Sequence, residues 1–160
     1  MTGSYDPELN LLYFGTGNPS PDFHGDDREG DNLFANSIVA LNADDGTRKW
    51  HYQFTPHDTH DWDSTHVPIL GDLPVRGQMR KVVMVANRNG FFYTLDRTSG
   101  QLLVGKPFVH TTWAKEIGSD GRPIVLPENT PNEKGAQTCP DLSGGTNFYP
   151  PSYDPNLRLF

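Results

Sequence analysis

Short runs of alternating apolar and polar side chains recur along the whole chain, and turns rich in glycine or proline separate them. Alternation with a period of two places the apolar side chains on one face of a β-strand. No run shows helical periodicity over more than a turn or two, so the pattern favours an all-β fold. The predicted strands are residues 9–14, 37–42, 48–54, 67–70, 81–87, 91–96 and 101–104. Residues 71–78 are predicted to be a turn region.

Two internal repeats organise these strands. The turn Leu41–Gly46 recurs as Leu95–Gly100, 54 residues further along the chain. Separately, Ser4–Leu11 recurs as Ser152–Leu159, at an offset of 148 residues. A repeat of about 50 residues, built from about four short strands, is typical of a β-propeller blade, and rings close with roughly four to eight blades. The sequence therefore predicts a partial β-propeller of about three blades.

Composition narrows the class of protein. The chain has 160 residues, the size of one domain, and its formal net charge of −7 disfavours nucleic acid as a main partner. No apolar run is long enough to span a membrane. Cys139 is the only cysteine, so no internal disulfide can form.

Both ends of the chain read as cuts in a longer protein. Met1 is followed at once by the turn Thr2–Pro7, and Leu157–Phe160 reads as a strand that stops partway. We therefore interpret residues 1–160 as the central part of a propeller that is truncated at both ends. Residues 106–146 are rich in Pro, Gly, Asn and Thr without a clear strand pattern, and are predicted to be an irregular insertion.

The segment Thr55–His66 holds three carboxylates and three imidazoles in twelve residues, and Trp62 is its only apolar residue. Asp61 and Asp63 are two apart, so in an extended segment they point to the same side. That placement suits a shared metal ion, or a carboxylate base beside one. A polar loop whose histidines bind backbone groups is the structural alternative, and spacing alone does not decide between them.

A second candidate lies after the first predicted strand, in Gly15-Thr16-Gly17-Asn18-Pro19. The glycines permit positive φ or close approach to the backbone, and Pro19 biases Asn18 toward an extended conformation. The polar stretch 22–32 that follows does not fit the twelve-residue calcium loop, so we interpret it as a solvated surface loop.

Several motifs follow one another along the chain: Gly15–Pro19, Gly30–Asn32, the hairpin around Trp50, Thr55–Asp58, Asp61–Asp63, Asn87–Gly90, Tyr93–Asp96 and Gly144–Asn147. In this order they resemble the pyrroloquinoline-quinone (PQQ)-dependent alcohol dehydrogenases of the methanol/ethanol dehydrogenase type, which are eight-bladed β-propellers. The resemblance continues to Pro155 and so covers essentially the whole chain. It implies oxidation of a primary alcohol to an aldehyde, with PQQ and either Ca²⁺ or a lanthanide ion as cofactors. It further implies a cytochrome c-type electron acceptor and a bacterial periplasmic location for the parent protein.

The resemblance assigns roles residue by residue. Asn18 corresponds to an asparagine whose side-chain oxygen ligates the metal, and Asp61 to the catalytic base, which also lies next to the metal. Asp63 stands where lanthanide-using members carry an aspartate, although related Ca²⁺ quinoproteins can carry one there too. Arg88 corresponds to the arginine that binds the quinone oxygens, and Asn147 to an asparagine that contacts the quinone from a later blade.

This sequence also departs from the family pattern. The metal-ligating glutamate, the adjacent-cysteine disulfide and the tryptophan platform of the family fall upstream of Met1. Thr59-His60 replaces a Glu-Trp pair that is common in methanol dehydrogenases, so the alcohol pocket is expected to differ. No C-x-x-C-H haem motif occurs. We therefore expect the isolated chain to bind quinone weakly, to show no turnover, and to aggregate through exposed blade edges.

Two other functions stay open at this point. A non-catalytic propeller, such as an outer-membrane assembly module, shares the blade type, although Asn18, Asp61 and Arg88 together disfavour it. A metal-dependent hydrolase built on the His/Asp loop would need an open zinc site with three ligands and an activated water. We interpret His57, His60 and His66 as structural or surface residues, and Trp50 as a core residue between blades.

Overall fold

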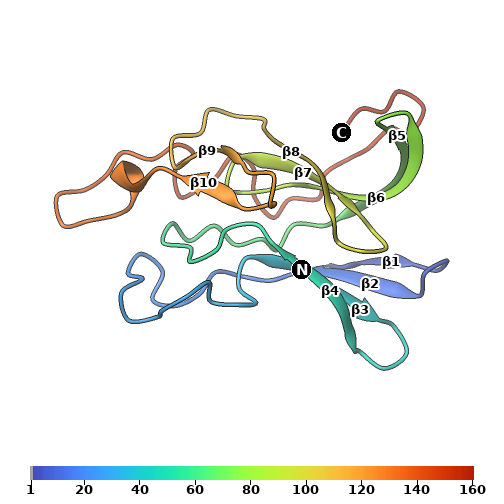
Figure 1. Ribbon diagram of the computed structural model, residues 1–160, viewed down its shortest axis with the longest axis horizontal. Helices are drawn as coiled ribbons and strands as arrows, with labels where there is room; N and C mark the ends of the chain where they lie inside the picture. The colour runs from blue at the N-terminus through green and yellow to red at the C-terminus, as the bar shows by residue number, and fades with distance from the viewer. Residues whose placement is uncertain (1) are drawn as a thin grey trace.

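The computed structural model describes residues 2–160, and nearly all of its regular structure is β (Figure 1). The strands are β1 (Ser4–Asp6), β2 (Leu11–Gly15), β3 (Ser37–Asn42), β4 (Arg48–Gln53), β5 (Ile69–Val75), β6 (Gln78–Ala86), β7 (Phe91–Asp96), β8 (Leu102–Pro107), β9 (Ala114–Ile117) and β10 (Pro123–Val125), and one 3-10 turn, η1, spans Pro127–Asn129.

Two four-stranded antiparallel sheets form the body of the molecule. Their strand orders are β1-β2-β3-β4 and β5-β6-β7-β8, so each sheet is a simple meander in chain order. Figure 1 shows the first sheet, in blue and teal, lying beneath the second, in green and yellow. This arrangement is that of two consecutive propeller blades, which we call the first and second blade.

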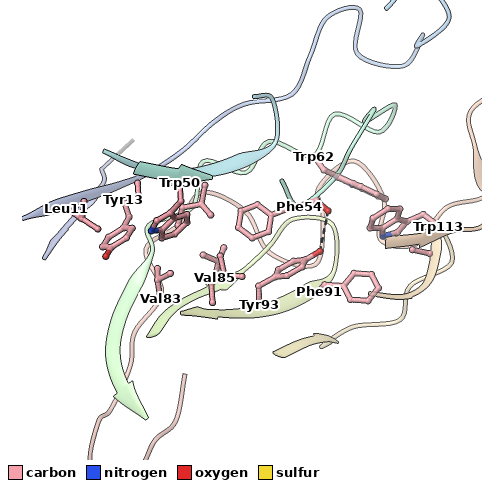
Figure 2. Close-up of a cluster of buried hydrophobic side chains, with 14 residues drawn as sticks. Leu11, Tyr13, Trp50, Phe54, Trp62, Val83, Val85, Phe91, Tyr93 and Trp113 are labelled. Carbon is pink, nitrogen blue, oxygen red and sulfur yellow. Dashed lines mark hydrogen bonds between the residues drawn. The ribbon is translucent and has the colours of Figure 1, made fainter. Parts of the chain in front are cut away.

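The apolar faces of the two blades meet in one core. Figure 2 shows this cluster running from Leu11, Tyr13 and Trp50 at one end to Trp62 and Trp113 at the other. Tyr13 and Trp50 pack with ring centroids 5.6 Å apart, and both side chains are nearly or fully buried. Trp50 therefore lies between the blades, as the sequence predicts.

Most predicted strands are present, with β3 and β7 at the predicted bounds. The turn region predicted over residues 71–78 is wrong, because β5 continues to Val75 and β6 begins at Gln78. Only Arg76 and Gly77 turn the chain, both with positive φ (51° and 79°). Gly71 and Pro74 weaken the strand signal there, but β5 lies at the edge of its sheet, where proline is tolerated.

Within residues 106–146, predicted to be irregular, the structure contains the two-stranded ribbon β9–β10 and the turn η1. The ribbon, orange in Figure 1, lies beside β8. A Cβ on Gly105 of β8 would come within 3.1 Å of Ile117, so the approach of the two segments is close. The strands are three and four residues long and their register shifts, which explains why no alternation is visible in the sequence.

Both sequence repeats recur as structure. In the first blade, Asp6 pairs with Leu11 across a turn, and its carboxylate accepts the N–H groups of residues 8 and 9. At the offset of 148 residues, Asp154 pairs with Leu159, and its carboxylate accepts the N–H groups of residues 156 and 157. The described residues thus hold two complete blades, followed by the turn with which a third blade would begin. No helix within residues 2–160 is long and apolar enough to cross a membrane.

Candidate functional site

The predicted site residues come from loops that follow even-numbered strands. Alternate strands of an antiparallel meander run in the same direction, so the carboxyl ends of β2, β4 and β6 lie at one end of the two blades. Asn18 follows β2, the loop with Asp61 and Asp63 follows β4, and Arg88 follows β6. The sheets therefore bring together residues that are up to 70 positions apart in the sequence.

Asp58 holds the β4–β5 loop in shape. Its side chain is buried, and one carboxylate oxygen accepts hydrogen bonds from the Asn36 amide at 2.9 Å and the Trp62 N–H at 2.8 Å. The other oxygen accepts the His60 N–H at 2.9 Å. Because the carboxylate binds both sides of Asp61, it fixes the backbone on which that residue sits. Asp58 has no predicted role, because Asn36 approaches it only in the folded chain.

Asp63 lies against the segment after β2. Its Oδ1 accepts the backbone N–H of Asn18 at 3.0 Å, and the N–H of Ser64 donates to the carbonyl of Thr16 at 3.0 Å. A Cβ on Gly17 would come within 2.8 Å of Asp63 Oδ1, so a larger residue there would displace the Asp63 carboxylate. The glycine signal in the sequence thus marks a close contact between two loops.

Arg88 faces both aspartates. Its Nη1 lies 3.2 Å from Asp63 Oδ2, and its Nη2 lies 4.0 Å from Asp61 Oδ2. The guanidinium is largely buried, with 12% of the side chain exposed. Its Nε and Nη2 both donate to the carbonyl oxygen of Leu142, at 3.0 and 2.6 Å. Leu142 is a partner that the sequence does not reveal, because a backbone carbonyl carries no residue signature.

Asp61 is placed under strain and in a mixed electrostatic environment. Its φ of 57° lies in the left-handed region, which costs free energy for a residue other than glycine. Burial raises the pKa of Asp61 above its usual value, Arg88 opposes this shift, and the negative charge of Asp63 adds to it. Such a carboxyl group accepts a proton more readily than an ordinary aspartate.

His66 is buried next to these charges. Neither ring nitrogen has a hydrogen-bond partner within residues 2–160, and 5% of the residue is exposed. Burial, and secondarily the charge of Arg88, lower the pKa of His66 to about 4, although the charge of Asp63 opposes the shift. At neutral pH the imidazole is therefore uncharged and adds no positive charge beside Arg88. The other two histidines of the Thr55–His66 segment contact backbone carbonyl oxygens, His57 that of Gly30 and His60 that of Asn129.

The oxygen atoms fit part of the coordination shell of a hard cation. The Asn18 amide nitrogen donates to Pro19 O at 3.1 Å and Asp22 Oδ1 at 2.9 Å, so its oxygen is the side-chain atom left for another partner. Across residues 2–160, no group of three or more His, Cys, Asp or Glu side chains is placed to hold a metal ion alone. A Ca²⁺-type shell takes six to eight oxygens. Asn18, Asp61 and Asp63 are thus a partial donor set that needs further ligands.

Asn147 is linked to the other predicted residues only indirectly. Its amide donates to Ser143 O at 3.1 Å, and its oxygen accepts the N–H of Phe148 at 2.8 Å. It follows the segment that contacts Arg88, since the N–H of Gly145 donates to Arg88 O at 3.0 Å. The structure therefore groups Asn18, Asp61, Asp63 and Arg88 directly, with Asn147 on an adjoining loop.

Comparison with known proteins identifies the family of the chain. Residues 1–116 match the PQQ family model described as the glucose/ethanol/alcohol dehydrogenase β-propeller domain. The quinoprotein alcohol dehydrogenase PedH of Pseudomonas putida is 44% identical over 168 aligned positions, which cover 100% of this chain and 28% of PedH. The lanthanide-dependent methanol dehydrogenase of Methylacidiphilum fumariolicum is 41% identical, over 98% of this chain and 26% of that protein.

Solved structures give the same result. A europium-containing methanol dehydrogenase superposes with a TM-score of 0.93 at 39% identity, over 98% of this chain and 28% of that one. The quinohemoprotein alcohol dehydrogenase of Comamonas testosteroni superposes with a TM-score of 0.93 at 42% identity, over 97% of this chain and 23% of that one. The chain spans about a quarter of the length of these proteins. On its sequence, its two blades and these matches, the chain belongs to the PQQ family of glucose/ethanol/alcohol dehydrogenase β-propellers.

Proposed function

We propose that this chain supplies one side of the active site of a quinoprotein alcohol dehydrogenase, which oxidises a primary alcohol to an aldehyde. The observation that carries the proposal is the convergence of Asp61, Asp63 and Arg88, with the Asn18 backbone, at the end of two adjacent blades. Family membership supports it, because the relatives reported above are named as alcohol or methanol dehydrogenases.

Asp61 acts as the base in this proposal. Alcohol oxidation requires removal of the hydroxyl proton while hydride leaves the carbon, and a positioned carboxylate can take that proton. Burial raises the pKa of Asp61, and this makes it a better proton acceptor once it is ionised. Asp58 and the strained backbone hold the carboxylate in place, so little reorganisation is needed when substrate binds.

Asn18, Asp61 and Asp63 would hold a hard cation, either Ca²⁺ or a lanthanide, together with ligands from elsewhere in the protein. Oxygen donors suit such ions, whereas zinc sites use mainly thiolate and imidazole. Asp63 adds a second carboxylate, and the additional negative charge favours a trivalent ion by Coulomb attraction. Asp63 also pairs with Arg88 at 3.2 Å, so part of that charge is already balanced in this structure.

Arg88, with Asn147 nearby, would bind the quinone oxygens. PQQ, when bound, supplies the two-electron redox chemistry, which protein side chains cannot perform. Arg88 places a fixed positive charge where electron density develops, and its burial strengthens that effect. A cytochrome c-type acceptor and a periplasmic location for the protein belong to the same proposal. Quinohemoprotein relatives support haem-linked electron transfer.

The test is alcohol-dependent dye reduction by the full-length gene product, reconstituted with PQQ and either Ca²⁺ or La³⁺. Asp61→Asn should lower kcat by at least about a hundredfold, the usual share of general-base catalysis. Asp63→Ala should remove any preference for La³⁺. Asp45→Asn is the matched control, because the Asp45 carboxylate lies in the exposed turn between β3 and β4, where it accepts hydrogen bonds from Thr47. Turnover that survives Asp61→Asn would exclude this base, and absence of turnover with either ion would favour a non-catalytic propeller.

A second experiment concerns the 160-residue chain by itself. We propose that it shows no turnover with PQQ and either ion, because its donor set holds two carboxylates and one amide oxygen where six to eight oxygens are needed. Turnover by the purified chain would contradict this proposal.

A further inference from the structure

The guanidinium of Arg88 does not pair with the site carboxylates in the strongest available geometry. Arginine and a carboxylate usually form two parallel hydrogen bonds. Here Arg88 approaches Asp63 with one nitrogen, at 3.2 Å, and stays 4.0 Å from Asp61. Asp63 accounts for part of this, because its Oδ1 is bound to the Asn18 N–H at 3.0 Å and only its Oδ2 pairs with Arg88. A second restraint lies on the opposite side of the arginine.

The segment 141–145, which we call the arginine clamp, holds Arg88 from that side. Leu142 O accepts from both Nε and Nη2, at 3.0 and 2.6 Å, and the N–H of Gly145 donates to Arg88 O at 3.0 Å. Gly144 has a φ of 82°, and a Cβ there would overlap Cγ of Arg88 and come within 2.6 Å of its carbonyl oxygen. The clamp therefore holds the backbone, the aliphatic part of the side chain and the guanidinium of Arg88 in place.

The clamp also contacts the aspartate loop. The indole N–H of Trp62, which lies between Asp61 and Asp63, donates to the carbonyl oxygen of Asp141 at 3.0 Å. The donor side of this hydrogen bond is fully buried, whereas Asp141 lies at the surface. A single five-residue segment thus sets the distance between Arg88 and both carboxylates.

We propose that the arginine clamp, with Gly144 as its positioning residue, keeps Arg88 from closing onto Asp61 and Asp63 and so keeps it oriented toward the quinone. The proposal rests on the quinone function proposed above. Two of the five N–H groups of Arg88 are taken by Leu142 O and one by Asp63, which leaves one on each terminal nitrogen for a ligand. Without the clamp, the Arg88 guanidinium would rotate into bidentate pairing with Asp61 or Asp63. This pairing would compete with the metal ion for the carboxylate and with the quinone for the guanidinium.

The first test is PQQ affinity of the full-length apoprotein, titrated in Ca²⁺ by fluorescence. Gly144→Ala should weaken binding at least about tenfold, the loss expected for one charge-assisted hydrogen bond. Gly135→Ala is the matched control, because Gly135 has nearly the same φ (81°) in the same long segment, but a Cβ added there would meet nothing within 4 Å. It should stay within about twofold of wild type. Equal affinities of the two variants would overturn the proposal.

If the proposal holds, Gly144→Ala lowers the affinity for PQQ through Arg88. A double-mutant cycle measures this coupling. In an Arg88→Ala background, Gly144→Ala should cause no further loss of affinity, whereas independent losses would multiply. If Gly144→Ala does not fold, as judged by circular dichroism, Arg88→Lys decides instead. Lysine keeps the charge but lacks the fork, so it should bind PQQ about as weakly as Arg88→Ala. Wild-type affinity in Arg88→Lys, or multiplying losses in the cycle, would overturn the proposal.

A readout without quinone separates this inference from the proposed function. In the ¹⁵N-arginine spectrum of the apoprotein, the Arg88 Nε–H signal should be protected from solvent exchange, because it donates to Leu142 O. Protection should persist in Gly135→Ala and be lost in Gly144→Ala. If wild type binds no PQQ but shows this pattern, the function fails and the clamp stands. An unprotected signal in wild type overturns the clamp whatever the affinity for PQQ.

Discussion

The turns Leu41–Gly46 and Leu95–Gly100 have the same local geometry but different environments. Each closes with a hydrogen bond from the N–H of its glycine to the carbonyl oxygen of the motif's second residue, at 2.9 Å to Asn42 O and 2.8 Å to Asp96 O. Both glycines have positive φ, 70° and 76°. The tip of the first turn is exposed to solvent, whereas Asp96, Arg97 and Gly100 of the second are buried.

The second turn is buried because it packs against the first blade. The carbonyl of Arg97 accepts from Tyr13 Oη at 2.8 Å and from Trp50 Nε1 at 3.2 Å. Its guanidinium pairs with Asp6 at 2.6 Å and Asp72 at 2.8 Å. The turn sequence therefore determines the backbone conformation of each turn. Contacts with the neighbouring blade determine how much each turn contributes to the stability of the protein. Three substitutions test this difference.

Arg97→Ala should have the largest effect, a loss of about 3–5 kcal/mol in the free energy of unfolding, because it leaves the buried carboxylate of Asp6 without its partner. The measurement is urea unfolding of the full-length protein. Arg122→Ala is the control, since Arg122 pairs with Asp31 at the surface with about half of its side chain exposed (52%). Its loss should stay below about 1 kcal/mol. Equal losses would contradict the comparison.

Gly100→Ala should destabilise the protein more than Gly46→Ala, although the two glycines occupy equivalent positions. A Cβ on Gly100 would lie 2.6 Å from the Trp50 ring, while one on Gly46 meets nothing within 4 Å. We expect losses of about 2–4 kcal/mol for Gly100→Ala, from overpacking and positive φ together. Gly46→Ala should cost about 1 kcal/mol, from positive φ alone. Thermal unfolding of both variants measures this, and similar losses would show that the packing on Trp50 relaxes freely.

Asp96→Asn should have the smallest effect of the three, about 2 kcal/mol at neutral pH, and should change the acid response. Burial alone would raise the pKa of Asp96, but hydrogen bonds from Thr98, Arg80 and Ser99 outweigh it and lower the pKa to about 2. A lowered pKa gives stability that is present above the unfolded value of 3.8 and is lost as pH falls toward 2.

The measurement is the free energy of unfolding of wild type and Asp96→Asn between pH 5 and pH 2, roughly the interval that these two pKa values bracket. The difference between the proteins should shrink as pH falls. Asn42 is at the equivalent position of the first turn, and its side-chain oxygen accepts a hydrogen bond from the Asp44 N–H. Asn42→Ala removes this hydrogen bond without changing the charge. It should cost about 1 kcal/mol at every pH. A pH-independent difference for Asp96→Asn would mean that its carboxylate is not specially stabilised.

Much of the fold was predictable because its signals are local. Alternation predicted β3 and β7 at their observed bounds, and the sequence repeats predicted turns that share their closing hydrogen bonds in the structure. Family resemblance, confirmed by the match over residues 1–116, named Asn18, Asp61, Asp63 and Arg88 as candidates. Strand β1, most of β5 and the β9–β10 ribbon were missed. Residues 4–6 lie inside a predicted turn, Gly71 and Pro74 hide the pattern of β5, and the ribbon strands are too short to show one.

The sequence alone determined the blade type and the turn geometry, since repeats and short local patterns carry both. Its resemblance to a known family named the residues proposed to carry chemistry. Only the tertiary structure decided which turn is buried, that Asp58 shapes the loop through Asn36, and that Leu142 O and Gly144 hold Arg88. These contacts join positions 22 to 91 residues apart, and several of them use backbone atoms or the space beside a glycine, so a local pattern does not reveal them. They exist because antiparallel meanders bring distant loops to one end of the sheets.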